Sequence, residues 1–301
     1  MSEDNEADTS TCCASCGIAE IDDIKWKDCD GCDLVRYCSD ECKRNHKLEH
    51  EEACTQRAAE LREELLFRQP ESSHRGDCPI CSVPMPLDEM KSTVWSCCSK
   101  FTCNGCTLAN QLRTIKTSHE PSCPFCREPT TGSGEEEQDK RDKLRMKRVE
   151  ANDPVAIHKE GMDHLNKGNY IRAFEYWTNS AEMGVVEAHY DLAHMYHKGI
   201  GVEKNKGKEI YHLEEAAIGG HPLARHNLGC NEYDNANIAR AVKHWIIAAT
   251  QGNDGSIKAL MEKFKRGLVE KDVLATTLRA HKAAVDATKS PQRTASEKYF
   301  H

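Results

Sequence analysis

Small residues recur at a regular interval in the second half of the chain, which predicts stacked helices. The pattern is Ala, Gly three residues later and then a second Ala: Ala181, Gly184 and Ala188; Ala217, Gly220 and Ala224; and, less closely, Ala249, Gly252 and Ala259. The large residues Trp177, Leu213 and Trp245 precede it at intervals of 36 and 32 residues. Such a period is typical of helix-turn-helix units that stack to bury their apolar faces. We therefore predict an all-α helical solenoid over residues 153–270, with both tryptophans in its core.

Four other segments lack the pattern of an apolar core. Residues 1–11 are acidic and polar after Met1, which predicts a disordered acidic tail. Residues 55–75 place leucines among charges at helical spacing up to Pro70, which predicts a helical linker. Residues 130–152 change from small polar residues to an acidic and then a basic run, which predicts a charged linker, with a helix in its charged half as one alternative. We expect a C-terminal helix and tail over residues 271–301.

Fifteen of the 17 cysteines lie in two blocks with pairwise spacing. The ligand pairs of the first block are Cys13 and Cys16, Cys29 and Cys32, Cys38 and Cys42, and His50 and Cys54; those of the second are Cys78 and Cys81, Cys97 and Cys98, Cys103 and Cys106, and Cys123 and Cys126. Thiolate and imidazole are the ligands that structural zinc prefers. A disulfide framework is the alternative, but no apolar signal stretch follows Met1. We therefore predict two small zinc-stabilised modules that bind four zinc ions.

Composition limits the classes of partner. With 38% hydrophobic and 30% charged residues, a chain of 301 residues is long enough for two or three domains. The sequence has no run of about eighteen apolar residues, so we expect no membrane partner. A formal net charge of −8 argues against nucleic acid as the main partner and favours proteins. We expect a cytoplasmic protein; the basic run Lys140 to Arg148 leaves nuclear import as an alternative to a solvated helix face.

The first block, residues 12–54, resembles the MYND zinc finger through its two CxxC pairs, its Tyr37-Cys38-Ser39 segment and its closing HxxxC. The resemblance implies a cross-brace in which Cys13, Cys16, Cys38 and Cys42 bind one zinc, and Cys29, Cys32, His50 and Cys54 bind the other, with Cys12 left over. It also implies a surface for proline-containing peptides, although Lys43 and Lys47 stand where the family has Gln and Trp. A purely structural zinc module is the alternative.

The second block, residues 76–129, resembles a RING finger through CPIC at 78–81, CCSKFTCNGC at 97–106 and CPFCR at 123–127. The resemblance implies that Cys78, Cys81, Cys103 and Cys106 bind one zinc, and that Cys97, Cys98, Cys123 and Cys126 bind the other. Lys100 stands where the family has a histidine ligand, so we prefer the all-cysteine site to one completed by His119.

RING fingers act as ubiquitin ligases by positioning a ubiquitin-conjugating enzyme, without a catalytic side chain of their own. The positions that match the docking groove of the family are Ile80, Pro124 and Arg127, whereas Asn110 stands in place of its usual aromatic residue. Two hypotheses therefore stay open: a RING-type ubiquitin ligase and a RING-like interaction module.

The repeat unit at residues 188–224 resembles the Sel-one-like repeat, a relative of the tetratricopeptide repeat. The matching positions are Ala188, Leu192, Tyr196, Gly199, Gly201, Val202, Lys208, Ala216, Ala217, Gly220 and Ala224. Ala193 replaces a family Gly, and Glu209 replaces an Ala. The resemblance implies a scaffold. Within this unit His189, His194 and His197 lack a carboxylate that would complete a metal site, and Cys230 in the next unit is expected to pack rather than react.

These observations indicate an intracellular zinc-binding adaptor for protein partners. In one hypothesis it is a RING-type ubiquitin ligase whose repeats select the substrate. In the other it is a non-catalytic scaffold that assembles complexes through all three modules. A sequence-specific transcriptional regulator is disfavoured by the net charge and by the absence of a recognition-helix finger pattern.

Overall fold

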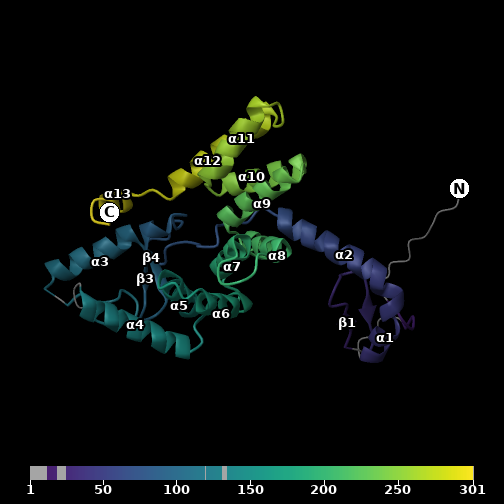
Figure 1. Cartoon of the computed structure of the whole chain (residues 1–301), viewed down its shortest axis with the longest axis horizontal. Helices are drawn as coiled ribbons and strands as arrows, with labels where there is room; N and C mark the ends of the chain where they lie inside the picture. The colour runs from purple at the N-terminus through teal and green to yellow at the C-terminus, as the bar shows by residue number, and fades with distance from the viewer. Residues whose placement is uncertain (1–11, 19–24, 119, 131–133, 301) are drawn as a thin grey trace. The chain divides into compact units, whose positions relative to one another are not determined.

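The computed structural model describes residues 12–18, 25–118, 120–130 and 134–300 (Figure 1). The chain separates into two compact units, Met1–Arg68 and Gln69–His301, which are described one at a time. The predicted acidic tail, residues 1–11, lies outside the described residues.

The first unit holds a short hairpin and two helices. Strands β1 (Lys27–Asp28) and β2 (Arg36–Tyr37) pair antiparallel, and α1 (Asp40–Asn45) follows. Ser39 caps α1, because its hydroxyl accepts the Cys42 N–H at 3.2 Å. Helix α2 (Lys47–Phe67) begins within the first cysteine block and runs through most of the segment expected as a linker. The last helix of the block and the predicted connecting helix are therefore one helix.

The second cysteine block opens the second unit. It contains the 3₁₀ turn η2 (Glu89–Lys91), the antiparallel strands β3 (Ser92–Trp95) and β4 (Lys100–Cys103), and α3 (Asn104–Lys116). The Trp95 indole donates to the Thr102 hydroxyl at 2.9 Å, which orients the ring across the hairpin. The core of this block is small: its buried cluster consists of Met85 and three cysteines, Cys78, Cys103 and Cys106. So small a core depends on metal for its stability.

Helix α4 (Glu135–Glu150) occupies the range expected as a charged linker and packs against α5. The contact is polar. The Arg145 side chain is 11% exposed and pairs with Glu160 at 2.9 Å and with Asp163. The charged half of this segment is therefore a helix that is joined to the repeats by ion pairs, which an apolar periodicity does not reveal.

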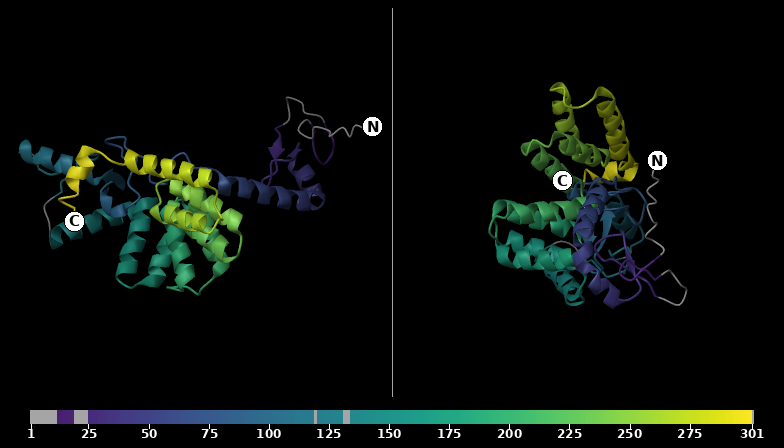
Figure 2. Two further views of the ribbon diagram at one scale, coloured as in Figure 1. Left: turned by 90° about the horizontal axis from the view of Figure 1, so that it is seen from above. Right: turned by 90° about the vertical axis from the view of Figure 1, so that its right-hand side faces the viewer.

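The repeats form successive helix pairs, as predicted (Figures 1 and 2). The pairs are α5 (Pro154–Asn166) with α6 (Tyr170–Glu182), α7 (Val186–Lys198) with α8 (Lys206–Ile218), α9 (Pro222–Asp234) with α10 (Ile238–Thr250), and α11 (Asp254–Lys265) with α12 (Lys271–Ala287). Each pair also contacts the next. Trp177 and Trp245 are each 2% exposed, which confirms both as core residues. Helix α13 (Pro291–Ser296) follows α12.

Glycine and tryptophan face each other across two of these pairs. A Cβ on Gly161 would lie 2.6 Å from Trp177 Cδ1, and one on Gly229 would lie 2.5 Å from Trp245 Nε1. The pair between them has Ala193 and Leu213, both buried, at the corresponding positions. In these pairs a smaller residue on the first helix therefore accompanies a larger one on the second, which keeps the space between the helices filled.

Candidate zinc centres and binding surfaces

The structure brings the sixteen predicted ligand side chains together in four groups of four. The groups are Cys13, Cys16, Cys38 and Cys42; Cys29, Cys32, His50 and Cys54; Cys78, Cys81, Cys103 and Cys106; and Cys97, Cys98, Cys123 and Cys126. Within each group the ligand atoms all lie within 4.8 Å of one another. In both blocks the first pair joins the third and the second joins the fourth, which is the cross-braced arrangement. Cys12 belongs to none of these groups.

The spacing within the groups fits zinc. A zinc–thiolate bond of about 2.3 Å in a tetrahedron places two sulfurs roughly 3.8 Å apart. The Sγ atoms of Cys16 and Cys38 are 3.6 Å apart, those of Cys98 and Cys123 3.7 Å, and those of Cys81 and Cys103 3.9 Å. A disulfide would need about 2.05 Å. All the cysteines are free, so the structure disagrees with the disulfide alternative and each group can hold a zinc ion.

Backbone N–H groups lower the pKa of the first ligand cysteine of each block, Cys13 and Cys78. Burial opposes ionisation of Cys13, but N–H groups of Cys38, Cys16 and Ser15 outweigh it and lower the pKa of Cys13 to about 6. In the second block, burial likewise opposes ionisation of Cys78, and N–H groups of Cys103, Ile80 and Cys81 lower its pKa to about 7. Zinc binds the thiolate, so these contacts favour the form of the ligand that the metal needs.

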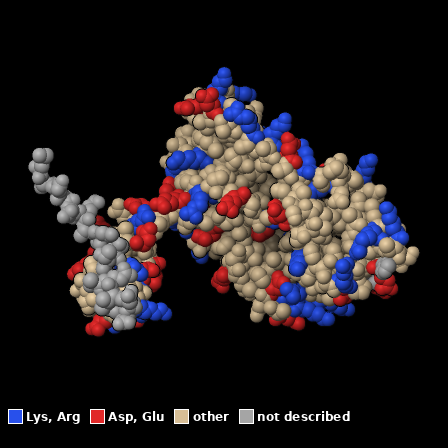
Figure 3. Space-filling model, turned by 180° about the vertical axis from the view of Figure 1, so that it is seen from behind, with Lys and Arg blue, Asp and Glu red and all other residues tan. Residues whose placement is uncertain are grey.

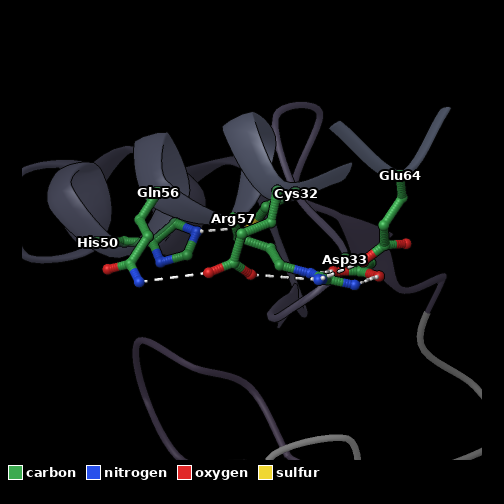
Figure 4. A network of polar contacts seen from close by, with 7 residues as sticks. Cys32, Asp33, His50, Gln56, Arg57 and Glu64 are labelled. Atoms are coloured by element: carbon green, nitrogen blue, oxygen red, sulfur yellow. Dashed lines mark hydrogen bonds and ion pairs between the residues drawn. The ribbon is translucent and has the colours of Figure 1, made fainter. Parts of the chain in front are cut away.

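Helix α2 is held against the second zinc group of the first block by charge (Figure 4). His50 Nε2 lies 3.1 Å from Cys32 Sγ. One turn further on from Cys54, Arg57 donates to both carboxylate oxygens of Asp33, at 2.7 and 3.0 Å. This hydrogen bonding lowers the pKa of Asp33. Asp33 follows Cys32 directly, so Arg57 fixes the loop that carries this ligand. Arg57 was not among the residues predicted from the sequence, although its ion pair with Glu60 at i+3 was a local signal.

Lys100 and Asn110 mark where the second block departs from the RING pattern. Lys100 Nζ lies 5.1 Å from the centre of the Phe125 ring and is in none of the ligand groups. Both adjacent cysteines, Cys97 and Cys98, enter one group instead. His119 lies outside the described residues. Asn110 Nδ2 donates to the Ser122 carbonyl at 2.9 Å and thereby ties α3 to the segment before the last cysteine pair.

The three candidate docking residues differ in exposure. Ile80 is 46% exposed and Arg127 is exposed, whereas Pro124 is half-buried. None of the three belongs to a ligand group. Their side chains are therefore open to substitution without direct loss of a zinc ligand.

A cavity of about 560 Å³ lies on the first block, lined by Tyr37, Lys43, Lys47 and other residues of α1 and α2. Lys43 Nζ pairs with Asp30 at 2.7 Å, and this contact raises the pKa of Lys43. Lys43 is therefore partly engaged within the finger, while Lys47 lies exposed at the start of α2. This cavity includes both positions at which the sequence departs from the MYND pattern.

The remaining candidates of the repeats make structural contacts. His189 Nδ1 lies 3.0 Å from His212 Nδ1, and His197 Nδ1 lies 3.2 Å from the Glu209 carboxylate. His194, His197 and Cys230 line a cavity of about 380 Å³. Among the described residues, no metal-binding group includes these histidines. Cys230 is half-buried against the cluster of Trp245, and burial raises the pKa of its thiol, as expected for a packing role.

The surface carries both signs of charge. On the face shown in Figure 3, Lys and Arg side chains are interspersed with Asp and Glu. Among the described residues, no helix is both long and apolar enough to cross a membrane.

Comparisons with known proteins agree with two of the three modules. Residues 13–54 match the MYND finger, and residues 157–185, 186–221 and 222–253 match the Sel1 repeat. A comparison with curated proteins gives no match.

Two solved structures show limited similarity. One is a protective antigen present in uropathogenic Escherichia coli strains that displays an SLR fold, at 26% identity and a TM-score of 0.40, over 47% of this chain and 32% of that chain. The other is a Sel1 repeat protein from Oxalobacter formigenes, at 24% identity and a TM-score of 0.43, over 50% of this chain and 64% of that chain. The chain thus spans less than two thirds of either structure. From the family matches, it contains a MYND finger at residues 13–54 and Sel1 repeats within residues 157–253, with a RING-like arrangement of cysteines between them.

Proposed function

We propose that the protein is an adaptor that joins protein partners through its MYND finger and its Sel1 repeats, and that zinc builds its binding surfaces. The observation that carries this proposal is that every zinc group has four protein ligands. A catalytic zinc keeps an open position for water or substrate, whereas four protein ligands close the site. Zinc held in these groups therefore fixes the backbone and leaves recognition to the surrounding side chains.

Each recognition module offers a concave surface. The MYND finger has the 560 Å³ cavity beside Lys47, and the repeats have the 380 Å³ cavity between α7 and α9. The first supports binding of a proline-containing peptide, the partner class that the family resemblance implies. Fluorescence polarisation with labelled proline-containing peptides tests this function. We expect binding that is lost when a chelator removes zinc, because the cavity is bounded by Cys29, His50 and Cys54. Equal binding by the chelated protein would contradict the proposal.

A more specific candidate function is RING-type ubiquitin ligation. Two features favour it: the cross-braced arrangement of the second block, and the exposure of Ile80 and Arg127 outside the ligand groups. A ligase of this kind holds the charged conjugating enzyme in its reactive geometry, so that positioning lowers the barrier to transfer. The repeats, which lie in the same compact unit, would then present the substrate.

Discharge of ubiquitin from a panel of conjugating enzymes tests this candidate. The Ile80→Ala variant should lose discharge and keep the zinc content of the unaltered chain, since Ile80 lies between ligands and is not one of them. Arg127→Ala should slow transfer more than it weakens docking. Ile115→Ala is the matched control, because Ile115 is an exposed isoleucine of the same module, 72% exposed on α3. If the unaltered chain discharges no conjugating enzyme, the scaffold function stands in place of the ligase.

A further inference from the structure

The C-terminal helix α13 packs against the N-terminal end of α3 in the RING-like block (Figure 2). The contact is between backbones. A Cβ on Gly105 would lie 2.8 Å from Arg293 N and 2.9 Å from the carbonyl carbon of Gln292. A glycine at this position therefore lets α13 approach α3 this closely. Ser290 starts the helix, since its hydroxyl accepts the Arg293 N–H at 3.2 Å.

The side chain of Arg293 extends from α13 into the block and is almost fully enclosed, with the residue 8% exposed. Its Nη1 donates to the carbonyls of Pro84 and Thr288, at 2.6 and 2.7 Å, and its Nη2 donates to the carbonyl of Val83 at 2.9 Å. Nη2 also lies 3.7 Å from the Sγ of Cys81. One guanidinium thus holds the loop that follows Cys81 and contacts a zinc ligand.

The charge of the zinc group explains why a cation is buried here. Burial of a guanidinium is costly unless an opposite charge compensates it, and the three carbonyl partners are neutral. In the occupied group Cys78, Cys81, Cys103 and Cys106, four thiolates outweigh the double charge of the zinc ion, so the group is anionic. The guanidinium and the thiolates therefore stabilise each other.

We propose that Arg293 is a positioning residue in the outer shell of this zinc group, and that α13 belongs to the metal-binding module. The residue hydrogen-bonds the ligand-bearing loop and compensates the charge of the thiolates, which is the role that outer-shell partners have at metal sites. The inference rests on zinc occupancy of the group. It extends the module from one continuous block to two segments that are far apart in the sequence.

The rate at which zinc leaves the full-length protein tests this proposal. Arg293→Met keeps the length of the side chain and removes its charge and donors. We expect one of the four zinc ions to transfer to a chromogenic chelator about 10- to 100-fold faster, with the other three unchanged. Arg279→Met is the matched control, because Arg279 is exposed on α12 and hydrogen-bonds Thr276 of the same helix. Arg293→Lys should release this ion at an intermediate rate, since lysine keeps the charge but not the planar set of donors.

A purely structural role is distinguished by NMR of the cadmium-substituted protein. In Arg293→Met, loss of an outer-shell donor should move one cadmium signal of the four, whereas all four signals would stay in place if Arg293 served only to hold α13 on the block. If Arg293→Met fails to fold, Gly105→Ala displaces α13 with Arg293 intact, and the same single ion should be released faster. Unchanged release and unchanged signals in both variants would overturn the proposal. A zinc count below four in the unaltered chain would instead contradict the occupancy on which it rests.

Discussion

The Gly229 and Trp245 contact gives a sharp test of how the repeats pack. A Cβ at Gly229 would lie 2.5, 2.6 and 3.0 Å from three atoms of the Trp245 indole, a rigid ring that is 2% exposed. Replacement of Gly by Ala within a helix gains up to about 1 kcal/mol of helix propensity. Overpacking of a well-packed core costs about 1–3 kcal/mol. Since the ring has little room to move, we expect Gly229→Ala to destabilise the protein by roughly 1–2 kcal/mol.

The sign of this effect should reverse when the ring is removed. Trp245→Leu leaves a cavity and should cost about 2–3 kcal/mol, less than the 3–5 kcal/mol of a Trp→Ala change. In that background a Cβ at position 229 fills space, and the pair becomes the Ala and Leu found at positions 193 and 213. Gly229→Ala should then be neutral or stabilise the protein by up to about 1 kcal/mol through helix propensity. The double-mutant cycle should therefore show a favourable coupling of about 1–3 kcal/mol.

Denaturant unfolding of the full-length zinc-loaded protein, followed by far-ultraviolet circular dichroism, measures these differences. Gly207→Ala is the control, because its Cβ would meet its closest neighbour, Asn205 Oδ1, at an ordinary 3.5 Å. This control should be neutral or slightly stabilising. If the two substitutions have additive effects on the free energy of unfolding, or if Gly229→Ala is as stable as the control, the close packing of Gly229 against Trp245 does not determine the size of the residue at position 229.

Two further predictions concern metal and pH. Chelation should release four zinc ions per chain and unfold the cysteine blocks, while most of the helical signal of the repeats persists. If native mass spectrometry finds only two zinc ions per chain, one of the two blocks does not bind zinc as predicted. His212 is packed beside His189, and burial first, then His189, lowers its pKa to about 4. The unfolded chain takes up this proton near pH 6.5, so the stabilisation is complete above about pH 6.5 and is lost as the pH falls towards 4. His212→Gln should flatten this part of the curve of unfolding free energy against pH.

Much of the architecture could be predicted from local sequence patterns. The two ligands of a pair lie three or four residues apart or are adjacent, so their spacing alone identifies each half of a metal site, and the structure groups the same residues. The repeat period placed Trp177 and Trp245 in the core because stacked units must bury one large residue each. In both cases the signal lies within a short stretch of sequence.

The features that the sequence did not reveal depend on distant or polar contacts. Helix α4 binds α5 through Arg145 and its carboxylate partners, and a charged segment of this kind has no apolar stripe to detect. Arg293 reaches Val83 and Pro84 across more than two hundred residues of sequence. No local pattern marks either contact, because an isolated arginine in a polar segment is most often solvated.

The position of α13 bears on how an adaptor of this kind would act. The RING-like block and the repeats belong to one compact unit, and α13, which follows the last repeat helix, anchors to the zinc group of the block. A partner bound to the repeats would then be held at a fixed place relative to Ile80, rather than on a flexible tether. A fixed arrangement raises the effective concentration of one bound partner for another only where the geometry suits both. The choice of partners would therefore depend on the docking of α13 as well as on the surfaces of the repeats and of the RING-like block.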